Sequence, residues 1–228
     1  MVNSKYSKVL TIILIIVIIA IIGILIFLGV DYYRKYYIDK EAGEAIDQFE
    51  EQVKNEVIQN NNISDNSTGS GGIADPYGNL VNETSSDVGG SNEISKKYKG
   101  YDMLGYIEIP KTDIRYPVID EVNPRALETS VARLHGPGLN KIGNTTIVGH
   151  NYRNGLFFSD NDKLEIGDKI YITDLSGTKR TYEIYDKFIT YPEDANFMTV
   201  ETNGVREISL STCTDDSKER IIIKAREV

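Results

Sequence analysis

The sequence predicts a mainly β domain, either an antiparallel barrel or a sandwich with a few helical turns, behind an N-terminal membrane-spanning helix. Two observations carry this prediction. Residues 9–30 form one uncharged and almost wholly aliphatic run. The last 131 residues, 98–228, alternate short β-rich runs with turn residues. A chain of 228 residues is long enough for one domain or two small ones. The change in composition between the aliphatic run and the β-rich region indicates that these are separate parts of the protein.

The apolar run is the first element. Its 22 residues are close to the roughly 20 that cross a bilayer as a helix. A cleaved signal peptide would have an apolar region of about 7 to 15 residues and then a small-residue cleavage site, whereas this run meets Asp31 and a charged, aromatic segment. We therefore expect an uncleaved anchor at 9–30 after a short tail at 1–8. Basic residues lie on both sides of it, so their count does not settle its orientation.

A polar helix and a linker are expected next. Over residues 31–58, apolar side chains recur at three- and four-residue steps, which is typical of an amphipathic helix; they are Ile38, Ala42, Ala45, Ile46, Phe49, Val53 and Val57. This stalk is either a spacer or a surface that packs on a partner or on the domain. Residues 59–97 are rich in Asn, Ser, Thr, Gly and Asp. They contain too little apolar surface to offset the entropy of ordering, so we expect a flexible linker.

The strands of the C-terminal domain are expected where branched and aromatic residues concentrate between turn signals. The runs are 106–109, 114–119, 145–149, 169–174, 181–191, 205–212 and 219–225. Residues 175–178 are expected to form a hairpin turn. Asn123 is a plausible N-cap for a short helix with Pro124 at its first position, followed by Ala126, Leu127, Val131 and Ala132. The domain is large enough for one closed core.

Charge and cysteine content exclude some classes of protein. Two of the 25 basic residues and none of the 34 acidic residues precede Asp31, so the rest of the chain has 23 basic and 34 acidic residues and a net charge of −11. This acidic body argues against a nucleic-acid-binding protein. The single cysteine, Cys213, cannot form an intramolecular disulfide. It is either a buried small hydrophobic residue or a residue with a chemical use.

Three side chains at strand ends favour the second interpretation. His150 follows the apolar run 146–149, and Cys213 ends the run 208–212. Arg220 opens the last strand seven residues after Cys213, which places it on the neighbouring antiparallel strand near the same rim. A thiolate is a nucleophile that nearby positive charge favours. An imidazolium can protonate a leaving amine, and a guanidinium can stabilise an oxyanion or hold a substrate backbone.

Several motifs in the right order resemble the sortases, membrane-anchored transpeptidases of Gram-positive cell surfaces. The family signature Thr-Leu-x-Thr-Cys is matched by Ser209-Leu210-Ser211-Thr212-Cys213, with Ser in place of the first Thr, and a Gly-His strand end by Gly149-His150. The family arginine on the next strand is matched by Arg220. The segments 105–110 and 114–118 look like the first barrel strands of sortases. The resemblance covers about residues 101–228, with the anchor in the expected place.

The resemblance implies a fold and a reaction. The fold would be a closed antiparallel β-barrel of seven to eight strands with short helices, over residues 98–228. Cys213 would cleave a Leu-Pro-x-Thr-Gly-like sorting signal between Thr and Gly through a thioester, with His150 as general acid and base and Arg220 stabilising the oxyanion or substrate. An amine of a peptidoglycan precursor or of a pilin would then accept the acyl group. Thr212 would touch the substrate backbone or support the nucleophile. The barrel would lie outside the cell and the N-terminus in the cytoplasm.

Other interpretations stay open at this point. Another surface cysteine enzyme of the cell wall, or a catalytically silent tethered binding module, would also suit an anchored barrel. We expect no cofactor and no metal site, because two histidines and one cysteine include no close ligand pair. His135 is expected in a loop. The class of sortase is open as well: Asp75-Pro76-Tyr77 resembles the lid of pilus-building enzymes, but it is more simply a turn in the linker.

Overall fold

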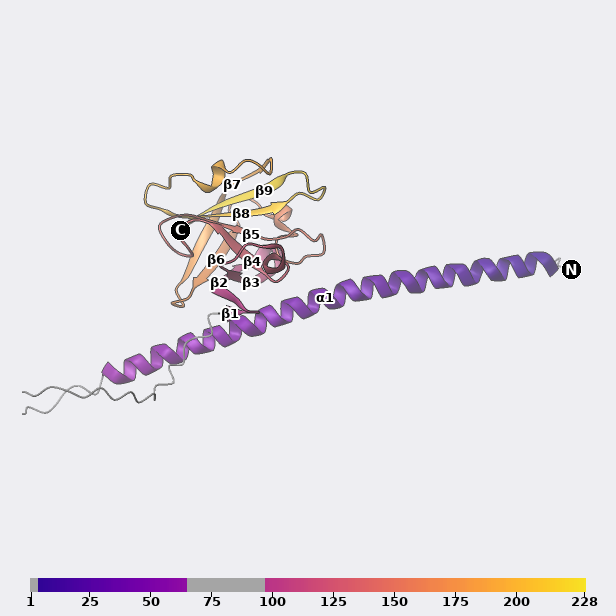
Figure 1. Ribbon diagram of the computed structural model, residues 1–228, viewed down its shortest axis with the longest axis horizontal. Coiled ribbons are helices and arrows are strands. Elements are labelled where there is room, and N and C mark those ends of the chain that lie inside the picture. The colour runs from indigo at the N-terminus through magenta and orange to yellow at the C-terminus, as the bar shows by residue number, and fades with distance from the viewer. Residues whose placement is uncertain (1–3, 65–96) are drawn as a thin grey trace, which may run out of the picture.

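The protein consists of one very long helix and a β-barrel that lies against the helix's second half (Figure 1). The computed structural model describes residues 4–64 and 97–228. Helix α1 spans Ser4–Ser64 without a break, so it continues six residues past the predicted end of the stalk at 58. The linker residues 65–96, including Asp75-Pro76-Tyr77, lie outside the described residues.

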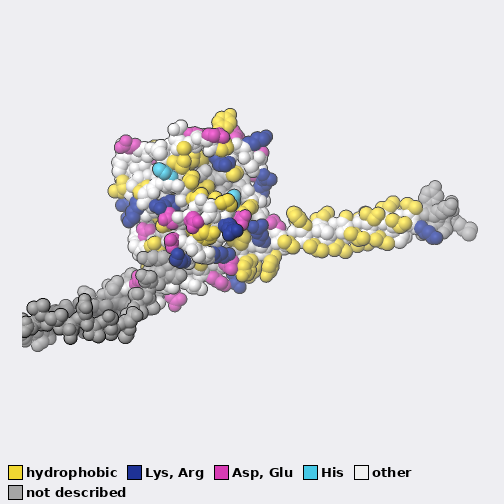
Figure 2. All heavy atoms as spheres, in the orientation of Figure 1, with side chains coloured by type: hydrophobic (Ala, Val, Ile, Leu, Met, Phe, Trp, Pro, Cys, Tyr) yellow, Lys and Arg dark blue, Asp and Glu magenta, His cyan; other side chains and the backbone are white. Residues whose placement is uncertain are grey.

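The N-terminal half of α1 projects away from the barrel. It carries a row of exposed aliphatic side chains (Figure 2), from Val9 at 54% exposed to Val30 at 64%. Within the described residues, one helix is long and apolar enough to cross a membrane, and none of its apolar stretch is buried. The segments predicted as anchor and stalk are therefore one continuous helix.

Eight of the nine described strands close into a barrel in the order β2-β3-β4-β5-β8-β9-β7-β6, with β6 pairing back onto β2. Strand β1 is a two-residue addition to the start of β2. The strands are β1 Lys97–Tyr98, β2 Tyr101–Ile109, β3 Ile114–Ile119, β4 Val131–His135, β5 Gly143–Val148, β6 Lys169–Asp174, β7 Lys179–Thr190, β8 Arg206–Cys213 and β9 Arg220–Glu227. The predicted mainly β, closed barrel with short helices is confirmed.

Two of the strand pairs are parallel, although we expected an antiparallel barrel. β3 pairs with β4 and β5 pairs with β8 in parallel registers, while the other pairings of the barrel are antiparallel. Long connections allow this, because parallel neighbours need a crossover rather than a tight turn. As a consequence, β5 and β8 end at the same rim of the barrel.

All seven predicted runs overlap with strands, but β4 and the two-residue β1 were missed. Val131 and Ala132 lie in β4 rather than in the predicted helix, which is the single turn α2, Pro124–Leu127. The predicted cap of α2 is confirmed, since the side chain of Asn123 accepts a hydrogen bond from the Ala126 amide. Three short 3-10 turns complete the described elements: η1 Pro110–Thr112, η2 Asn161–Lys163 and η3 Asn196–Met198. The predicted hairpin turn at 175–178 joins β6 to β7.

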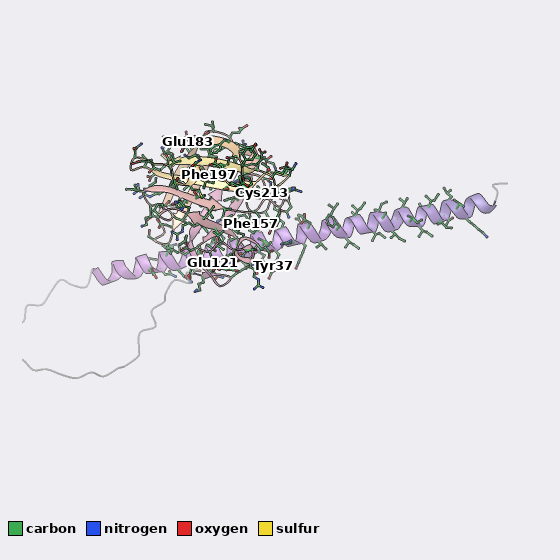
Figure 3. All side chains as sticks on the ribbon, turned by 45° about the horizontal axis from the view of Figure 1, so that its top comes forward. Tyr37, Glu121, Phe157, Glu183, Phe197 and Cys213 are labelled. Carbon is green, nitrogen blue, oxygen red and sulfur yellow. The ribbon has the colours of Figure 1, made fainter. Side chains whose placement is uncertain are left out.

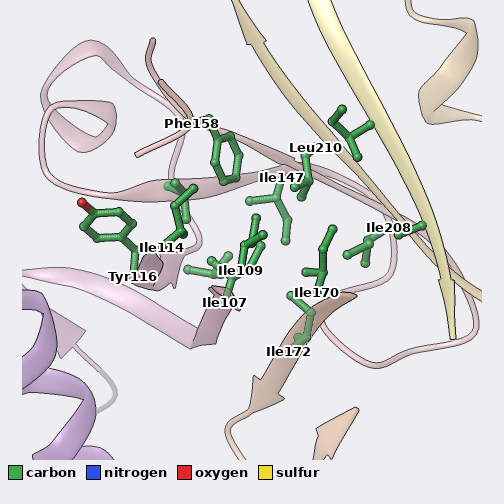
Figure 4. Close-up of a cluster of buried hydrophobic side chains, with 14 of the residues drawn as sticks. Ile107, Ile109, Ile114, Tyr116, Ile147, Phe158, Ile170, Ile172, Ile208 and Leu210 are labelled. Atoms are coloured by element: carbon green, nitrogen blue, oxygen red, sulfur yellow. The ribbon is translucent and has the colours of Figure 1, made fainter. Parts of the chain in front are cut away.

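Branched aliphatic side chains fill the barrel interior (Figure 4). On β8, Ile208 and Leu210 point inward, opposite Ala225 and Ile223 of β9. Because successive side chains of a strand point to opposite faces, the residues between them point outward. This alternation decides which side of the barrel carries the site.

The stalk packs on the barrel and is not a free spacer. Ala42, Ile46 and Phe49 are at most 2% exposed, and Phe49 meets Tyr106 of β2 edge to face at 6.2 Å. Polar contacts border this apolar seam: Arg115 of β3 donates to Asp47 at 2.8 Å, and the Tyr106 hydroxyl donates to Glu50 at 2.5 Å. Burial and the Glu50 carboxylate raise the pKa of Tyr106 to about 12, so the phenol keeps the proton that it donates.

Candidate active site

Cys213 and Arg220 lie directly opposite each other on β8 and β9. Residues opposite one another in an antiparallel pair project to the same face, with Cβ atoms about 4.5 to 5.5 Å apart. Since Ile208 and Leu210 point inward, Cys213 and Arg220 project from the outer face at one rim. Both side chains are half-buried. The sequence prediction that a short turn brings them together is realised in this register.

His150 reaches the same rim through the parallel pairing of β5 with β8. The ladder runs to Val148 opposite Ser211, and the amide of Gly149 then donates to the Ser211 carbonyl at 3.2 Å. Gly149 faces the interior, because a Cβ there would lie 2.8 Å from Val131 and 2.9 Å from Phe158. The next side chain, His150, therefore faces outward, on the side of Cys213. The glycine is required by this close packing of the core.

Two side-chain hydrogen bonds join the segment that carries His150 to the segment that carries Cys213. The Thr212 hydroxyl donates to the Gly149 carbonyl at 2.8 Å, and the Asn151 amide donates to the Cys213 carbonyl at 3.0 Å. Thr212 is 2% exposed, so its side chain offers a substrate no hydroxyl. Of the two roles expected for Thr212, the geometry favours support of the segment that carries Cys213 over contact with a substrate.

The turn after Cys213 is tied to the loop after His150 as well. Asn151 also donates to the Asp215 carboxylate at 3.0 Å, and the Arg153 guanidinium donates to the Asp215 carbonyl. These bonds hold the 151–153 loop against the β8–β9 turn. They fix the spacing of two segments that lie more than 60 residues apart in the sequence.

An aromatic ring lies against the imidazole of His150, and a second ring packs behind the first. The Tyr152 ring lies 5.0 Å from it, centroid to centroid, and is itself 5.9 Å from Phe157. Burial lowers the pKa of His150, and the carboxylate of Glu128 partly offsets this effect. The lowered pKa favours the neutral imidazole, which is the form that accepts a proton.

Helix α1 closes the other side of this aromatic group. The guanidinium of Arg34 lies over the Tyr152 ring, 5.6 Å from its centroid. Tyr116 of β3 packs edge to face on Phe157 at 5.0 Å, and its hydroxyl donates to Asp39 of α1. The polar half of α1 thus forms part of the surface beside His150.

The β7–β8 connection covers the outer face of the barrel beyond the site. The Asn144 amide of β5 donates to the carbonyls of Phe197 and Met198 in η3, at 2.9 and 3.1 Å, and accepts from the Ser209 hydroxyl at 3.0 Å. Ser209 projects outward on β8, four residues before Cys213. The connection therefore covers part of the strand that leads to Cys213.

Some residues near the site had not been singled out from sequence. Tyr152 and Asn151 belong to a polar loop whose position after His150 was the only available signal, and nothing in the sequence connects Arg34 or Glu128 with it. His135, expected in a loop, is the exposed last residue of β4, at the opposite rim. The side chains predicted to act together, Cys213, His150 and Arg220, are brought to one rim.

Comparisons with known proteins agree with this geometry. The family model described as "Sortase domain" matches residues 107–228. Sortase A of Bacillus anthracis is 30% identical over 124 residues, which cover 53% of this chain and 58% of that protein; the match thus spans less than two thirds of its length. A Clostridium perfringens sortase D5 transpeptidase is 29% identical with a TM-score of 0.51, covering 56% of this chain and 79% of that one. A sortase A lid mutant from Corynebacterium diphtheriae is 25% identical with a TM-score of 0.52, covering 56% and 71%.

Proposed function

The chain belongs to the sortase family, and from that premise we propose that it is a cysteine transpeptidase that acts on sorting signals of surface proteins. The observation that carries this proposal is the pairing of Cys213 with Arg220 on the outer face, beside the strand end that bears His150. A nucleophile, a proton carrier and an oxyanion partner at one rim form a constellation for acyl transfer.

In the first half-reaction, the Cys213 sulfur attacks the carbonyl carbon of the Thr–Gly bond in a Leu-Pro-x-Thr-Gly-like signal. His150, whose burial favours the neutral form, accepts the thiol proton and gives it to the nitrogen of the leaving glycine. The Arg220 guanidinium donates hydrogen bonds to the developing oxyanion or to the adjacent substrate carbonyl. The C–N bond breaks, and the acyl group stays on sulfur as a thioester.

In the second half-reaction, an amine attacks the thioester carbon. The amine belongs to a peptidoglycan precursor or to a pilin lysine. His150 accepts a proton from the attacking nitrogen, and the sulfur leaves and regains it, so the enzyme returns to its starting form with a new amide bond made. Thr212 and Asn151 do not touch the reacting atoms in this scheme; they hold the two strand ends at a fixed spacing.

The apolar half of α1 is proposed as a single-pass membrane anchor. Residues 9–30 would span the bilayer, with the N-terminus in the cytoplasm and the barrel outside the cell, where surface proteins are joined to wall or pilus. The long exposed aliphatic surface of this segment supports an anchor, and membership of a family of surface enzymes supports the orientation.

The test is cleavage of a quenched fluorescent peptide that bears a sorting signal, with the full chain in detergent micelles. We expect turnover by the natural chain and none by Cys213→Ala. Ser176→Ala, an exposed substitution in the β6–β7 turn at the opposite rim, is the matched control and should cleave normally. Mass spectrometry should show a thioester on Cys213. Cleavage that survives Cys213→Ala would overturn the mechanism.

A further inference from the structure

Helix α1 contacts the barrel at both rims. These two contacts show which rim lies nearer to the apolar segment of the helix. At the near end, Asn154 in the loop after His150 donates to the Asp31 carboxylate at 3.2 Å. At the far end, Val53 lies against Gly177 of the β6–β7 turn, where an added Cβ would meet it at 2.5 Å. Residues 31 and 53 are 22 positions apart, about 33 Å along a helix at 1.5 Å per residue. The catalytic rim is therefore the one beside the apolar segment.

The side chains at this level of α1 are those of a membrane interface. Tyr32, Tyr33, Tyr36 and Tyr37 are between 51% and 75% exposed and follow directly after the apolar run. Tyrosine is enriched where a membrane-spanning helix meets the headgroups. Arg34, between these tyrosines, lies over the Tyr152 ring beside His150. The headgroup level of the helix and the level of the active site coincide.

Figure 3 shows the same arrangement from another side, with Cys213, Phe157 and Tyr37 on the side of the barrel toward the free apolar helix. The contacts between α1 and the barrel are spread along the stalk, with Ala42, Ile46 and Phe49 buried between the two rims. The barrel thus has one orientation relative to the helix axis. Tilting of α1 in the bilayer would move both together.

We infer that α1 holds the catalytic rim at the headgroup level of the bilayer, so that the enzyme acts on peptides anchored in the same membrane with the scissile bond close to its surface. The substrate in this inference rests on the proposed function. The headgroup layer is roughly 5 to 8 Å deep on each side of the hydrocarbon core. The height of the signal above the bilayer then becomes a determinant of specificity, beside the side chains of the signal.

The placement is tested without reference to activity. Cys213→Ala removes the sole cysteine of the full chain. A single new thiol is then introduced, either at the catalytic rim by Asn154→Cys or at the opposite rim by Ser176→Cys. Each is labelled with an environment-sensitive fluorophore in phosphatidylcholine–phosphatidylglycerol vesicles that contain a headgroup spin label. We expect at least threefold stronger quenching at position 154 than at 176. Equal quenching, or stronger quenching at 176, would overturn the inference.

The functional consequence is tested by raising the barrel. Seven helix-forming polar residues inserted between Val30 and Asp31 add two turns, which keeps the docking face in register and lifts the rim by about 10 Å. The substrate is a vesicle-anchored peptide whose signal is followed directly by a membrane-spanning segment. We expect its cleavage to fall at least tenfold, while cleavage of the soluble peptide stays within twofold. A spacer of seven residues between signal and span should restore the anchored rate.

The outcomes separate the two proposals. An insertion that leaves cleavage of the anchored peptide unchanged contradicts the placement of the rim at the membrane, whatever the chemistry. Failure of every form to cleave even the soluble peptide contradicts the proposed function, and the quenching experiment still decides the placement. Slower cleavage of both peptides would show that the insertion damages the site, and would count against a rigid docking of α1.

Discussion

Replacing Ile46 by Ala is expected to loosen α1 from the barrel. Ile46 is fully buried in the small cluster formed with Phe49, Met103 and Tyr106. Truncation of a buried Ile to Ala removes apolar contacts and leaves a cavity, at a cost of about 2 to 5 kcal/mol. Because the barrel core is a separate cluster, most of this loss falls on the contact between helix and barrel.

Hydrogen exchange of the full chain in detergent micelles measures the effect. Isolated helices are marginally stable in water, so the amides of residues 42–53 depend on docking for protection. With each 1.4 kcal/mol worth tenfold in the opening equilibrium, Ile46→Ala should speed their exchange by about 30-fold to a few thousandfold. The apolar segment inside the micelle should be unaffected.

Ile166→Ala is the matched control, since it makes the same chemical change at a position that is 70% exposed. An exposed substitution of this kind alters stability by at most about 0.5 kcal/mol, and exchange at 42–53 should not change. If Ile46→Ala and Ile166→Ala gave the same exchange rates in the stalk, α1 would be a spacer and the inferred placement of the catalytic rim would lose its basis.

Local patterns were enough to predict the pair Cys213 and Arg220. A turn of six residues leaves two consecutive strands little choice but an antiparallel hairpin, so the opposing positions can be counted from the turn. The same holds for the cap of α2, where Asn123 and Pro124 act within one helical turn. The information that determines these features lies within ten residues of each.

Long-range pairing could not be predicted in this way. The alternation of inward and outward side chains along a strand is the same whether the neighbouring strand is parallel or antiparallel. Nothing in residues 143–148 therefore indicated β8 as a parallel partner. Yet that pairing brings His150 to the rim of Cys213. Strand β4 was missed for a related reason: Val131 and Ala132 continue a helical spacing from Ala126, and only pairing with β3 and β5 makes them a strand.

The docking of α1 on the barrel could be predicted only in part from the sequence. Its apolar stripe was predicted from three- and four-residue steps, and Ala42, Ile46 and Phe49 are indeed its buried members. A stripe does not identify its partner, however, since any apolar surface would cover it. The sequence left spacer and packed helix as alternatives, and the complementary surface on β2 and β3 decides for the packed helix.

Two further predictions concern the chemistry at the rim. Arg220→Ala should lower turnover of the signal peptide by about 10² to 10³, the loss typical of one oxyanion donor, with the exposed Arg125→Ala as a control that keeps full turnover; equal rates in the two variants would leave Arg220 without a role in the reaction. Glu128→Gln should move the acid limb of the pH profile of kcat/KM to lower pH. The reason is that burial lowers the pKa of His150 while Glu128 raises it, so removal of the carboxylate lowers the pKa further and the imidazole stays neutral, and able to accept the thiol proton, at a more acidic pH. Glu121→Gln, an exposed change before α2, should leave the limb in place, and a shift of the Glu128→Gln profile to higher pH would contradict the assignment of that limb to His150.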